Sequence, residues 1–187
     1  MKTLSLILAC TFEGGIGLNN TIPWYIKSDL IKFKNITTKT NDNLKENAVI
    51  MGSKTYDSLP YKKLKNRVNI VLTNNNEKYL NNDDIIIFNK IDDALKYCNN
   101  NTLIENIYII GGAKIYNIFL EKYKIDYIYL SLLKEKHFCN SNILINKIFD
   151  NFYFIKDDKY NEEKDRYVSY ICKNKFYNNI KHNSVSI

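Results

Sequence analysis

Hydrophobic residues in this chain fall into short continuous runs separated by polar segments. Six runs have the length of a β-strand and are rich in Ile and Val: residues 3–10, 48–51, 68–72, 85–88, 107–110 and 125–133. Continuous apolar runs of this length are typical of strands buried on both faces, as in a parallel sheet. We therefore predict a central sheet built from these segments.

The segments between the runs carry helical patterns. They lie at residues 28–37, 91–99 and 113–123, and a further helix is expected to start after Gly52. Ser28 stands in the N-cap position of the first helix, and Asp29 lies in its first turn, where an acid is favourable. Strands that alternate with helices favour an α/β fold with a mainly parallel sheet.

The last third of the chain has a different pattern. Two strand-like runs, 152–155 and 167–172, are separated only by a polar stretch, which predicts an antiparallel pair. The fold expected for the whole chain is therefore α/β: a single domain with a twisted, mainly parallel sheet of about eight strands, an antiparallel C-terminal pair and about four flanking helices. The domain is expected over residues 1–175, followed by a polar tail at 176–187.

The first ten residues allow two interpretations. A lysine followed by an apolar segment that ends at Cys10 could be a short signal peptide, whereas the same segment could be the first buried strand. The single charge and the short apolar core are marginal for a signal peptide. The glycine-rich segment that follows directly needs a strand before it, so we favour the strand.

Composition excludes several classes of protein. A length of 187 residues with 45% hydrophobic and 25% charged residues is typical of one globular domain, and no apolar run approaches the ~20 residues of a membrane-spanning helix. The net charge of +7 raises the possibility of nucleic-acid binding, but the lysines are scattered and interleaved with acids, so we expect no nucleic-acid partner and no membrane association.

The cysteines show no metal-binding pattern. They stand at positions 10, 98, 139 and 172 without CxxC spacing, and the chain has only two histidines. A zinc site needs four nitrogen or sulfur ligands at short spacings, so no metal is expected. Cys10 and Cys172 lie in apolar runs and are interpreted as buried thiols. A reducing, cytoplasmic location fits this usage.

Two segments combine a buried strand, glycine and a helix start, at residues 48–55 and 107–114. Free N–H groups at a helix start suit phosphate, and glycine lets a ligand approach the backbone. Each segment also carries a lysine, Lys54 or Lys114. A pair of such sites suits a dinucleotide diphosphate, although a glycine at a strand end can equally be a tight turn. Neither segment is a P-loop or a GxGxxG motif.

The strand at 68–72 ends at Thr73-Asn74, without the acid that a Rossmann NAD site places on the ribose. This difference favours a 2′-phosphorylated cofactor.

A third segment, residues 14–30, leaves the first strand as a glycine-rich loop, passes the only tryptophan and enters the first helix. Asp29 lies beside Leu30 and Phe33 on that helix, so its carboxyl could point into an apolar pocket. The alternative is an acid that only complements the helix dipole, worth about 0.3–1 kcal/mol. The residues alone leave these two roles open.

Five segments in order along residues 3–133 resemble the dihydrofolate reductase family. They are Gly15-Ile-Gly with Ile22-Pro-Trp and Asp29-Leu30, then residues 49–60 (VIMGSKTYDSLP), 64–73 (LKNRVNIVLT), 109–116 (IIGGAKIY) and 128–131 (IYLS). One such motif is weak, but five colinear ones are specific. The loop before Val49 resembles the longer eukaryotic form of the family. Beyond residue 133 the resemblance is only topological.

The resemblance implies reduction of 7,8-dihydrofolate to 5,6,7,8-tetrahydrofolate with NADPH, by hydride transfer to C6 and protonation of N5. By resemblance Asp29 is the ionisable group of the pterin pocket and promotes that protonation, Trp24 orders a water, and Ser131 stands where the family usually has Thr. These three form the implied catalytic group. The implied role belongs to one-carbon metabolism and thymidylate synthesis, with antifolate inhibitors as further ligands and functional coupling to a thymidylate synthase. A monomer is expected.

The implied binding residues form two sets. Substrate would meet Ile7, Leu30, Phe33, Lys34, Leu59, Arg67, Ile110 and Tyr116, with Arg67 pairing with the carboxylate of the glutamate tail. Cofactor would meet Ala9, Ile16, Gly17, Leu18, Gly52, Ser53, Lys54, Thr55, Leu72, Thr73, Asn74, Gly111, Gly112, Ala113, Lys114 and Ile115. The Gly111–Gly112 peptide would be cis, as in the family.

Departures from the family pattern leave alternatives. Ser53 replaces a basic residue, which puts one contact to the 2′-phosphate and the preference for NADPH over NADH in doubt. The loop at 62–65 before Arg67 is short. A related reductase could act on another pterin or on a pyrimidine of the flavin pathway, but such substrates lack a tail for Arg67. A binding protein without turnover, including one that binds RNA, is the other alternative, and Asp29 argues against it.

Overall fold

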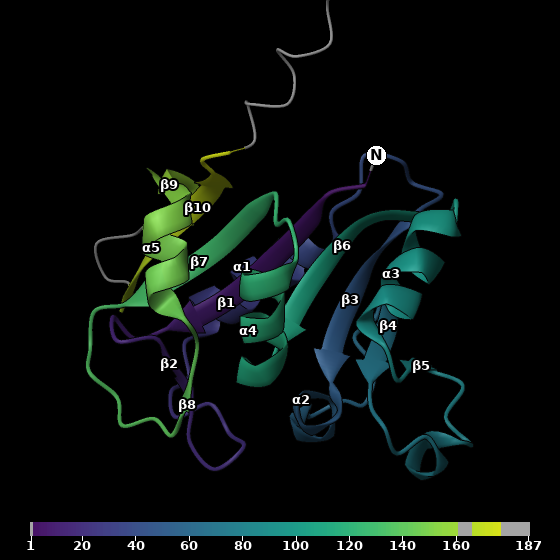
Figure 1. The fold of residues 1–187 in the computed structure, drawn as a ribbon. Coiled ribbons are helices and arrows are strands. Elements are labelled where there is room, and N and C mark those ends of the chain that lie inside the picture. Colours follow the sequence, from purple (N-terminus) through teal and green to yellow (C-terminus); the bar gives the residue numbers. More distant parts are fainter. Residues whose placement is uncertain (1, 161–165, 177–187) are drawn as a thin grey trace, which may run out of the picture.

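One eight-stranded sheet forms the centre of the computed structural model, which describes residues 2–160 and 166–176 (Figure 1). Its strand order is β5-β4-β3-β6-β1-β7-β10-β9. The strands are β1 (Leu4–Cys10), β3 (Glu46–Gly52), β4 (Arg67–Leu72), β5 (Ile86–Phe88), β6 (Ile104–Gly111), β7 (Tyr127–Leu133), β9 (Phe152–Lys156) and β10 (Tyr167–Asn174), and a separate pair joins β2 (Gly15–Gly17) to β8 (Ser141–Asn142). The helices are α1 (Lys27–Thr38), α2 (Ser53–Ser58), α3 (Ile91–Asn100), α4 (Ala113–Lys122) and α5 (Ile145–Asn151), with 3₁₀ turns at Glu77–Tyr79 and Asp158–Tyr160.

The pairing confirms the predicted fold class. Strand β1 pairs in parallel with β6 and β7, and β3 pairs in parallel with β4 and β6. Strand β10 runs antiparallel to both β7 and β9, as the C-terminal pattern predicts. The carboxyl ends of the parallel strands therefore meet at one edge of the sheet, which is where open α/β sheets bind ligands.

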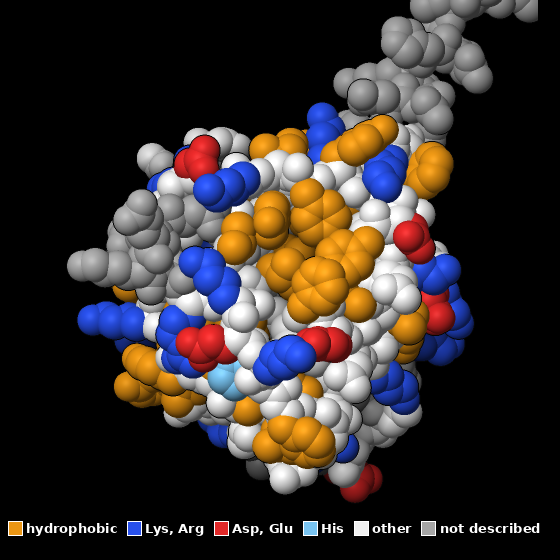
Figure 2. Space-filling model, turned by 90° about the vertical axis from the view of Figure 1, so that its left-hand side faces the viewer, with side chains coloured by type: hydrophobic (Ala, Val, Ile, Leu, Met, Phe, Trp, Pro, Cys, Tyr) orange, Lys and Arg blue, Asp and Glu red, His pale blue; other side chains and the backbone are white. Residues whose placement is uncertain are grey.

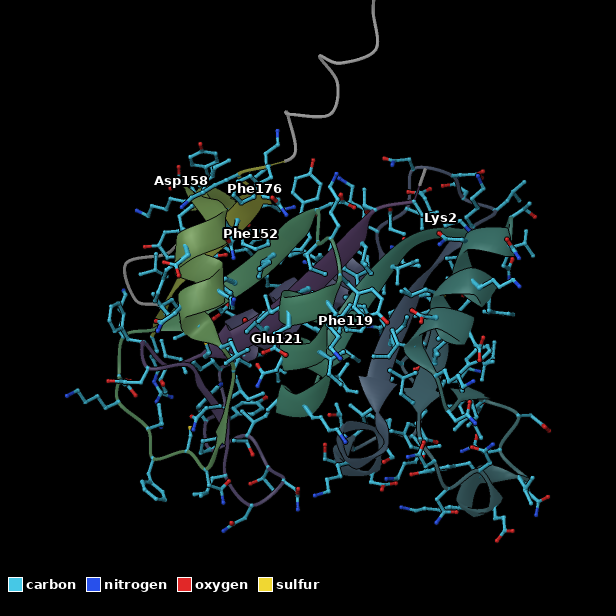
Figure 3. The ribbon with its side chains drawn as sticks, viewed as in Figure 1. Lys2, Phe119, Glu121, Phe152, Asp158 and Phe176 are labelled. Atoms are coloured by element: carbon cyan, nitrogen blue, oxygen red, sulfur yellow. The ribbon has the colours of Figure 1, made fainter. Side chains whose placement is uncertain are left out.

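The alternation of side chains along each strand divides the core into two layers. On one face α3, α4 and α5 pack against residues such as Leu6, Ile50 and Ile128, with Phe119 of α4 fully buried and Glu121 on the exposed side of the same helix (Figure 3). On the other face α1 and α2 cover residues such as Val49 and Val71. The sheet therefore lies between two helical layers, one on each face.

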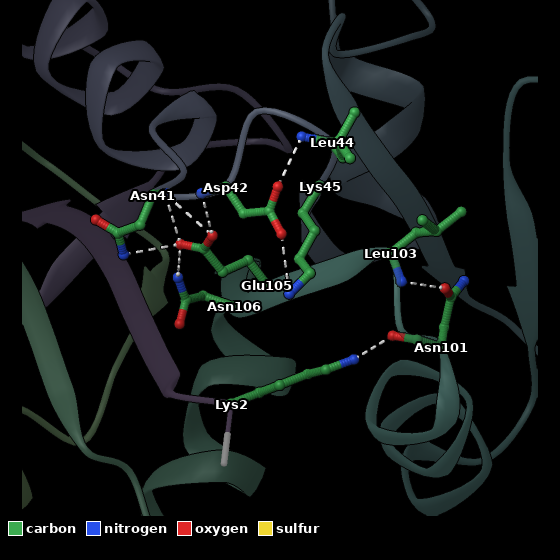
Figure 4. Close-up of polar contacts among 9 residues, drawn as sticks. All are labelled: Lys2, Asn41, Asp42, Leu44, Lys45, Asn101, Leu103, Glu105 and Asn106. Carbon is green, nitrogen blue, oxygen red and sulfur yellow. Dashed lines mark hydrogen bonds and ion pairs between the residues drawn. The ribbon is translucent and has the colours of Figure 1, made fainter.

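A polar network closes the amino edge of the sheet, opposite the edge where ligands are expected (Figure 4). The Glu105 carboxylate accepts hydrogen bonds from the backbone N–H groups of Asn41 and Asp42, which hold its pKa below the usual range. Lys45 pairs with Asp42 at 3.2 Å, and the Lys2 ammonium donates to the backbone oxygen of Asn101. These contacts fasten the loop between α1 and β3.

Apolar side chains also gather on the surface of the molecule at the antiparallel end of the sheet, beside α5 and β9 (Figure 2). Phe12 contacts Phe149 at 5.7 Å between ring centroids, Phe149 contacts Phe154 at 5.5 Å, and Phe154 contacts Tyr170 at 5.4 Å.

Across residues 2–160 and 166–176 we find no helix with the length and apolar character needed to cross a membrane.

Several local predictions were wrong. Helix α1 starts one residue before Ser28, with Ile26 as its N-cap and no side-chain hydrogen bond at the cap, because the chain enters the helix from an extended segment. Asn47, counted in the loop before Val49, is instead fully buried in β3. Helix α5 was missed because it spans only two turns, so five helices flank the sheet in the described ranges where about four were expected. Most of the predicted tail, residues 177–187, lies outside the described residues.

Candidate active site

Asp29 lies in the first turn of α1, between that helix and β7. The hydroxyl of Ser131 on β7 donates a 2.5 Å hydrogen bond to Asp29 Oδ1. Burial raises the pKa of the Asp29 carboxyl, while this hydrogen bond and the charge of Lys32 act in the opposite direction. Ser131 pairs with Ala9 of β1, so the carboxyl stands at the carboxyl ends of two adjacent central strands. The geometry makes Asp29 more than a partner of the helix dipole.

Lys32 is a site residue that sequence reasoning missed. It follows Asp29 by three positions, which places both side chains on one face of α1. Its side chain is 1% exposed, and its ammonium donates to Ser131 Oγ at 2.9 Å and to the Leu130 carbonyl at 3.2 Å. Burial lowers the pKa of Lys32 to about 8, although the charge of Asp29 opposes the shift. The spacing from Asp29 was the available signal, hidden because lysine is abundant throughout the chain.

Trp24 lies in the segment that leads into α1. Its indole ring packs against the His137 ring at 5.2 Å between centroids and against the buried cluster of Ile26, Leu133 and Tyr167. Leu133 is the last residue of β7, two positions beyond Ser131. Trp24 is therefore held at the same end of the sheet as the Ser131–Asp29 pair.

Arg67 is buried rather than exposed at the surface. It is 7% exposed at the start of β4, and its guanidinium donates to Thr37 Oγ1 at 2.8 Å and to the Lys65 carbonyl at 3.0 Å. It lies over the Phe33 ring, 5.8 Å from the centroid. These bonds use two of the five donors of a guanidinium. Arg67 therefore stands beside Phe33, which together with Leu59 packs against the α1/α2 face of the core.

Tyr116 connects the first helix turn of α4 to β1. Its hydroxyl donates to the Ile7 carbonyl at 2.7 Å, and burial raises its pKa, with Asp29 adding to the shift. Gly111 has a φ of +107°, and a Cβ there would lie 2.8 Å from Tyr116 Cε2. Only glycine fits this position. The Gly111–Gly112 peptide is cis, which confirms that prediction.

The two strand–glycine–helix segments lie side by side, since β3 and β6 are neighbours. A Cβ on Gly112 would lie 3.2 Å from Thr55 Oγ1, and a Cβ on Gly52 would lie 3.3 Å from Ile115 Cγ1. Lys54 and Lys114 are exposed beside them. A cradle of close backbone, hydroxyl and ammonium groups fits a dinucleotide diphosphate. Leu72 ends the adjacent β4 and is followed by Thr73 and Asn74, while Ser53, Ala113 and Lys114 open the two helices.

The glycine-rich loop lies beyond the end of β1. Gly15 donates its backbone N–H to Thr11 Oγ1 at 3.0 Å, and a Cβ on Gly15 would lie 2.7 Å from the Cys139 Cβ. Ile16 packs against the core, Gly17 pairs with Ser141, and Leu18 bonds with Thr21 in a tight hairpin. Of the remaining predicted residues, Ile110 is buried, whereas Leu30 is half exposed and Lys34 and Asn74 are exposed.

The described residues contain no group of three or more His, Cys, Asp or Glu side chains placed to hold a metal ion. Cys10, Cys98 and Cys172 are buried free thiols, and Cys139 is half-buried. The charged chemistry of the carboxyl edge is thus carried by Asp29, Lys32 and the exposed lysines of the glycine cradle, whereas Arg67 lies at the start of β4.

Comparison with known proteins gives one consistent result. The family model described as dihydrofolate reductase matches residues 3–176. The chain is 36% identical over 142 residues to the dihydrofolate reductase of Heliothis virescens, covering 74% of this chain and 77% of that protein. It is 34% identical over 163 residues to that of Aedes albopictus, covering 84% and 87%.

A bifunctional dihydrofolate reductase-thymidylate synthase of Paramecium tetraurelia is 38% identical over 152 residues, which cover 81% of this chain but only 30% of that protein. With a family model that spans nearly the whole described fold, and relatives matched over most of their own length, this chain belongs to the dihydrofolate reductase family of oxidoreductases.

Proposed function

We propose that this protein reduces 7,8-dihydrofolate to tetrahydrofolate with NADPH, and that Asp29 promotes protonation of N5. Membership of the family supports reduction of dihydrofolate with a nicotinamide cofactor. The observation that carries the specific proposal is the half-buried Asp29 carboxyl, hydrogen-bonded to Ser131 at the carboxyl edge of the sheet. That edge also holds the glycine cradle of β3 and β6.

Asp29 recognises the pterin through its two oxygens. Oδ1 accepts the Ser131 hydrogen bond, and Oδ2 accepts from the 2-amino group or the neighbouring ring nitrogen of the substrate. A carboxylate in a buried site stabilises positive charge on the pterin, so it favours the substrate protonated at N5. Trp24, fixed against His137 and Leu133, orders the water that carries the proton.

The remaining substrate contacts follow the α1 face. Leu30, Phe33, Leu59, Ile7, Ile110 and Tyr116 line the pterin and aminobenzoyl groups, and Lys34 lies at the exposed rim. Arg67 uses its remaining guanidinium donors to bind the carboxylate of the glutamate tail in a bidentate pair. Its bond to Thr37 holds the planar fork in place beside Phe33.

The cofactor side is formed by the glycine cradle and the loop after β1. Lys54, Thr55 and the start of α4 hold the phosphates, while Ala9, Ile16 and Leu18 contact the nicotinamide end. Bound NADPH supplies the hydride for C6 of the pterin. Thr73 and Asn74 flank the 2′-phosphate, and the uncharged Ser53 weakens that contact relative to a basic residue.

We also infer a role beside thymidylate synthase, since curated bifunctional relatives join the two activities in one chain. In that role the product supplies one-carbon metabolism. The buried free thiols support a reducing, cytoplasmic location.

Asp29→Asn tests the function directly. We expect turnover with dihydrofolate and NADPH to fall more than about 100-fold at neutral pH, with a smaller loss at low pH, where the substrate arrives protonated. Asp42→Asn is the matched control, because Asp42 lies at the opposite edge of the sheet and pairs with Lys45. Undiminished turnover of Asp29→Asn at neutral pH contradicts the assigned role. Oxidation of NADH as fast as NADPH contradicts the cofactor assignment.

A further inference from the structure

The most unusual group in the described structure is the ammonium of Lys32. Lys32 is 1% exposed, and its bonds go to the Leu130 carbonyl and to Ser131 Oγ. Burying an ammonium costs several kcal/mol unless partners compensate. A methionine would fill a similar volume without that cost. A physical role for the charge is therefore needed to explain the residue.

The hydrogen bonds of Lys32 fix the direction of the next bond. An ammonium only donates, so Ser131 Oγ must accept from Lys32 at 2.9 Å. The single proton of the Ser131 hydroxyl is then left to donate to Asp29 Oδ1 at 2.5 Å. Asp29 Oδ1 is thereby an acceptor, and because an ionised carboxylate accepts a stronger hydrogen bond than a neutral carboxyl, this bond favours the ionised form. In the hydrogen-bonded series Lys32–Ser131–Asp29, each residue therefore donates toward Asp29.

We propose that Lys32 is a positioning residue for dihydrofolate reduction, which acts through Ser131 to hold Asp29 ionised and oriented toward the substrate. The inference rests on the proposed role of Asp29 and adds a residue that sets when that role is available. Lys32 itself needs no contact with substrate, because Ser131 stands between its ammonium and the carboxylate.

Charged and titratable groups from four parts of the fold face the hydrogen-bonded series Lys32–Ser131–Asp29. Asp29 from α1, Asp157 after β9 and Cys172 from β10 act on Lys32, which also lies 5.7 Å from the centroid of the Tyr167 ring on β10. Tyr116 from α4 acts on the Asp29 side. Within this set Lys32 is the sole cation, so its charge adds to the Ser131 hydrogen bond in opposing the effect of burial on the Asp29 carboxyl.

Lys32→Met tests the proposal through the pH profile of kcat/KM for dihydrofolate, which reports groups of the free enzyme. Loss of the ammonium favours the protonated carboxyl, so the acid limb of the profile should move up by about one pH unit. On the acid limb the variant should lose up to about tenfold in kcat/KM, whereas on the plateau at higher pH it should lie within about twofold of the wild type. Lys27→Met, an exposed lysine of the same helix, should leave the profile unchanged.

A second pair of variants tests the hydroxyl between the two charges. Ser131→Ala should move the acid limb in the same direction, and Ser131→Thr, which keeps a hydroxyl, should restore it. Lys32→Met should then add little to Ser131→Ala, because both changes break one chain. A direct measurement is the infrared C=O band of the protonated Asp29 carboxyl, identified as the band absent in Asp29→Asn. In Lys32→Met this band should persist to higher pH than in the wild type.

The outcomes separate the two proposals. If Asp29→Asn keeps full turnover, the proposed function fails and the role of Lys32 fails with it. If Asp29→Asn is inactive but neither the acid limb nor the carboxyl band moves in Lys32→Met, the positioning role alone is overturned. A loss in Lys32→Met that is equal at every pH also overturns it, since that result describes structural damage.

Discussion

The two faces of the central sheet differ in the kind of side chain that they bury. The face covered by α3, α4 and α5 is packed almost entirely by aliphatic and aromatic side chains and cysteine. The face covered by α1 and α2 holds buried polar residues from five strands: Ser5, Asn47, Arg67 with Asn69, Ser131 and Ser169. Lys32 and Thr37 of α1 are buried on the same side.

This difference separates stability from chemistry. Apolar burial contributes roughly 25 cal/mol per Å² and needs no partner geometry, so the first face can be packed by volume alone. Each buried polar group on the second face costs free energy unless its hydrogen bonds are met. Asn69, for example, bonds with Leu64 through both its carbonyl oxygen and its amide nitrogen. The second face gives up stability to hold polar groups in place, among them Ser131 and Arg67 of the proposed site.

The largest effect is expected on the apolar face. Phe119→Ala removes a fully buried ring from α4 and should lower the free energy of unfolding by about 3–5 kcal/mol. Activity per folded molecule should stay close to that of the wild type, because the ring faces the core rather than the site. Chemical denaturation combined with a turnover assay on the folded fraction measures both. Phe176→Ala, at an exposed phenylalanine, is the control, and an equal loss of stability there contradicts the comparison.

The same division explains what the sequence could predict. The apolar runs located the central strands because these strands turn mainly apolar side chains toward α3, α4 and α5. The glycine segments predicted which edge of the sheet they occupy. A glycine directly after a strand marks a local backbone requirement, and such a requirement can be read from the nearby sequence. Lys32 and the burial of Asn47 escaped prediction, because a polar residue is buried only when distant partners such as Ser131 meet it. Those partners are set by tertiary packing, which no local pattern contains.

The next effect concerns the stability of the polar face. In the folded chain burial lowers the pKa of Lys32 to about 8, against 10.5 for an ordinary lysine. Below pH 8 the lysine is charged in both states, and the shift costs folding about 3 kcal/mol at 1.36 kcal/mol per pKa unit. Between pH 8 and 10.5 the unfolded chain binds more protons than the folded one, so stability rises with pH.

Lys32→Met should therefore be more stable than the wild type at pH 7, by about 1–3 kcal/mol. The difference should shrink as the pH rises from about 8 to about 10.5, because that cost of burying a charge disappears from the wild type. Denaturant unfolding of both proteins at pH 7, 9 and 10.5 measures it. Lys27→Met supplies the control for surface charge. A variant less stable than the wild type at pH 7 shows instead that the ammonium stabilises the fold.

The smallest effect is expected in binding at the far end of the polar face. Arg67→Leu removes the buried guanidinium beside Phe33 and should raise KM for dihydrofolate by about ten- to a hundredfold, as expected for one charge-assisted pair. The dissociation constant of NADPH should not change. Arg166→Leu is a matched control, because that exposed arginine pairs with Glu135 and is the other arginine of the chain. Dihydropteroate, which lacks the glutamate tail, sharpens the assignment: wild type and Arg67→Leu should bind it equally. A similar loss with and without the tail means that Arg67 supports the local fold around Phe33 rather than binding the carboxylate of the substrate.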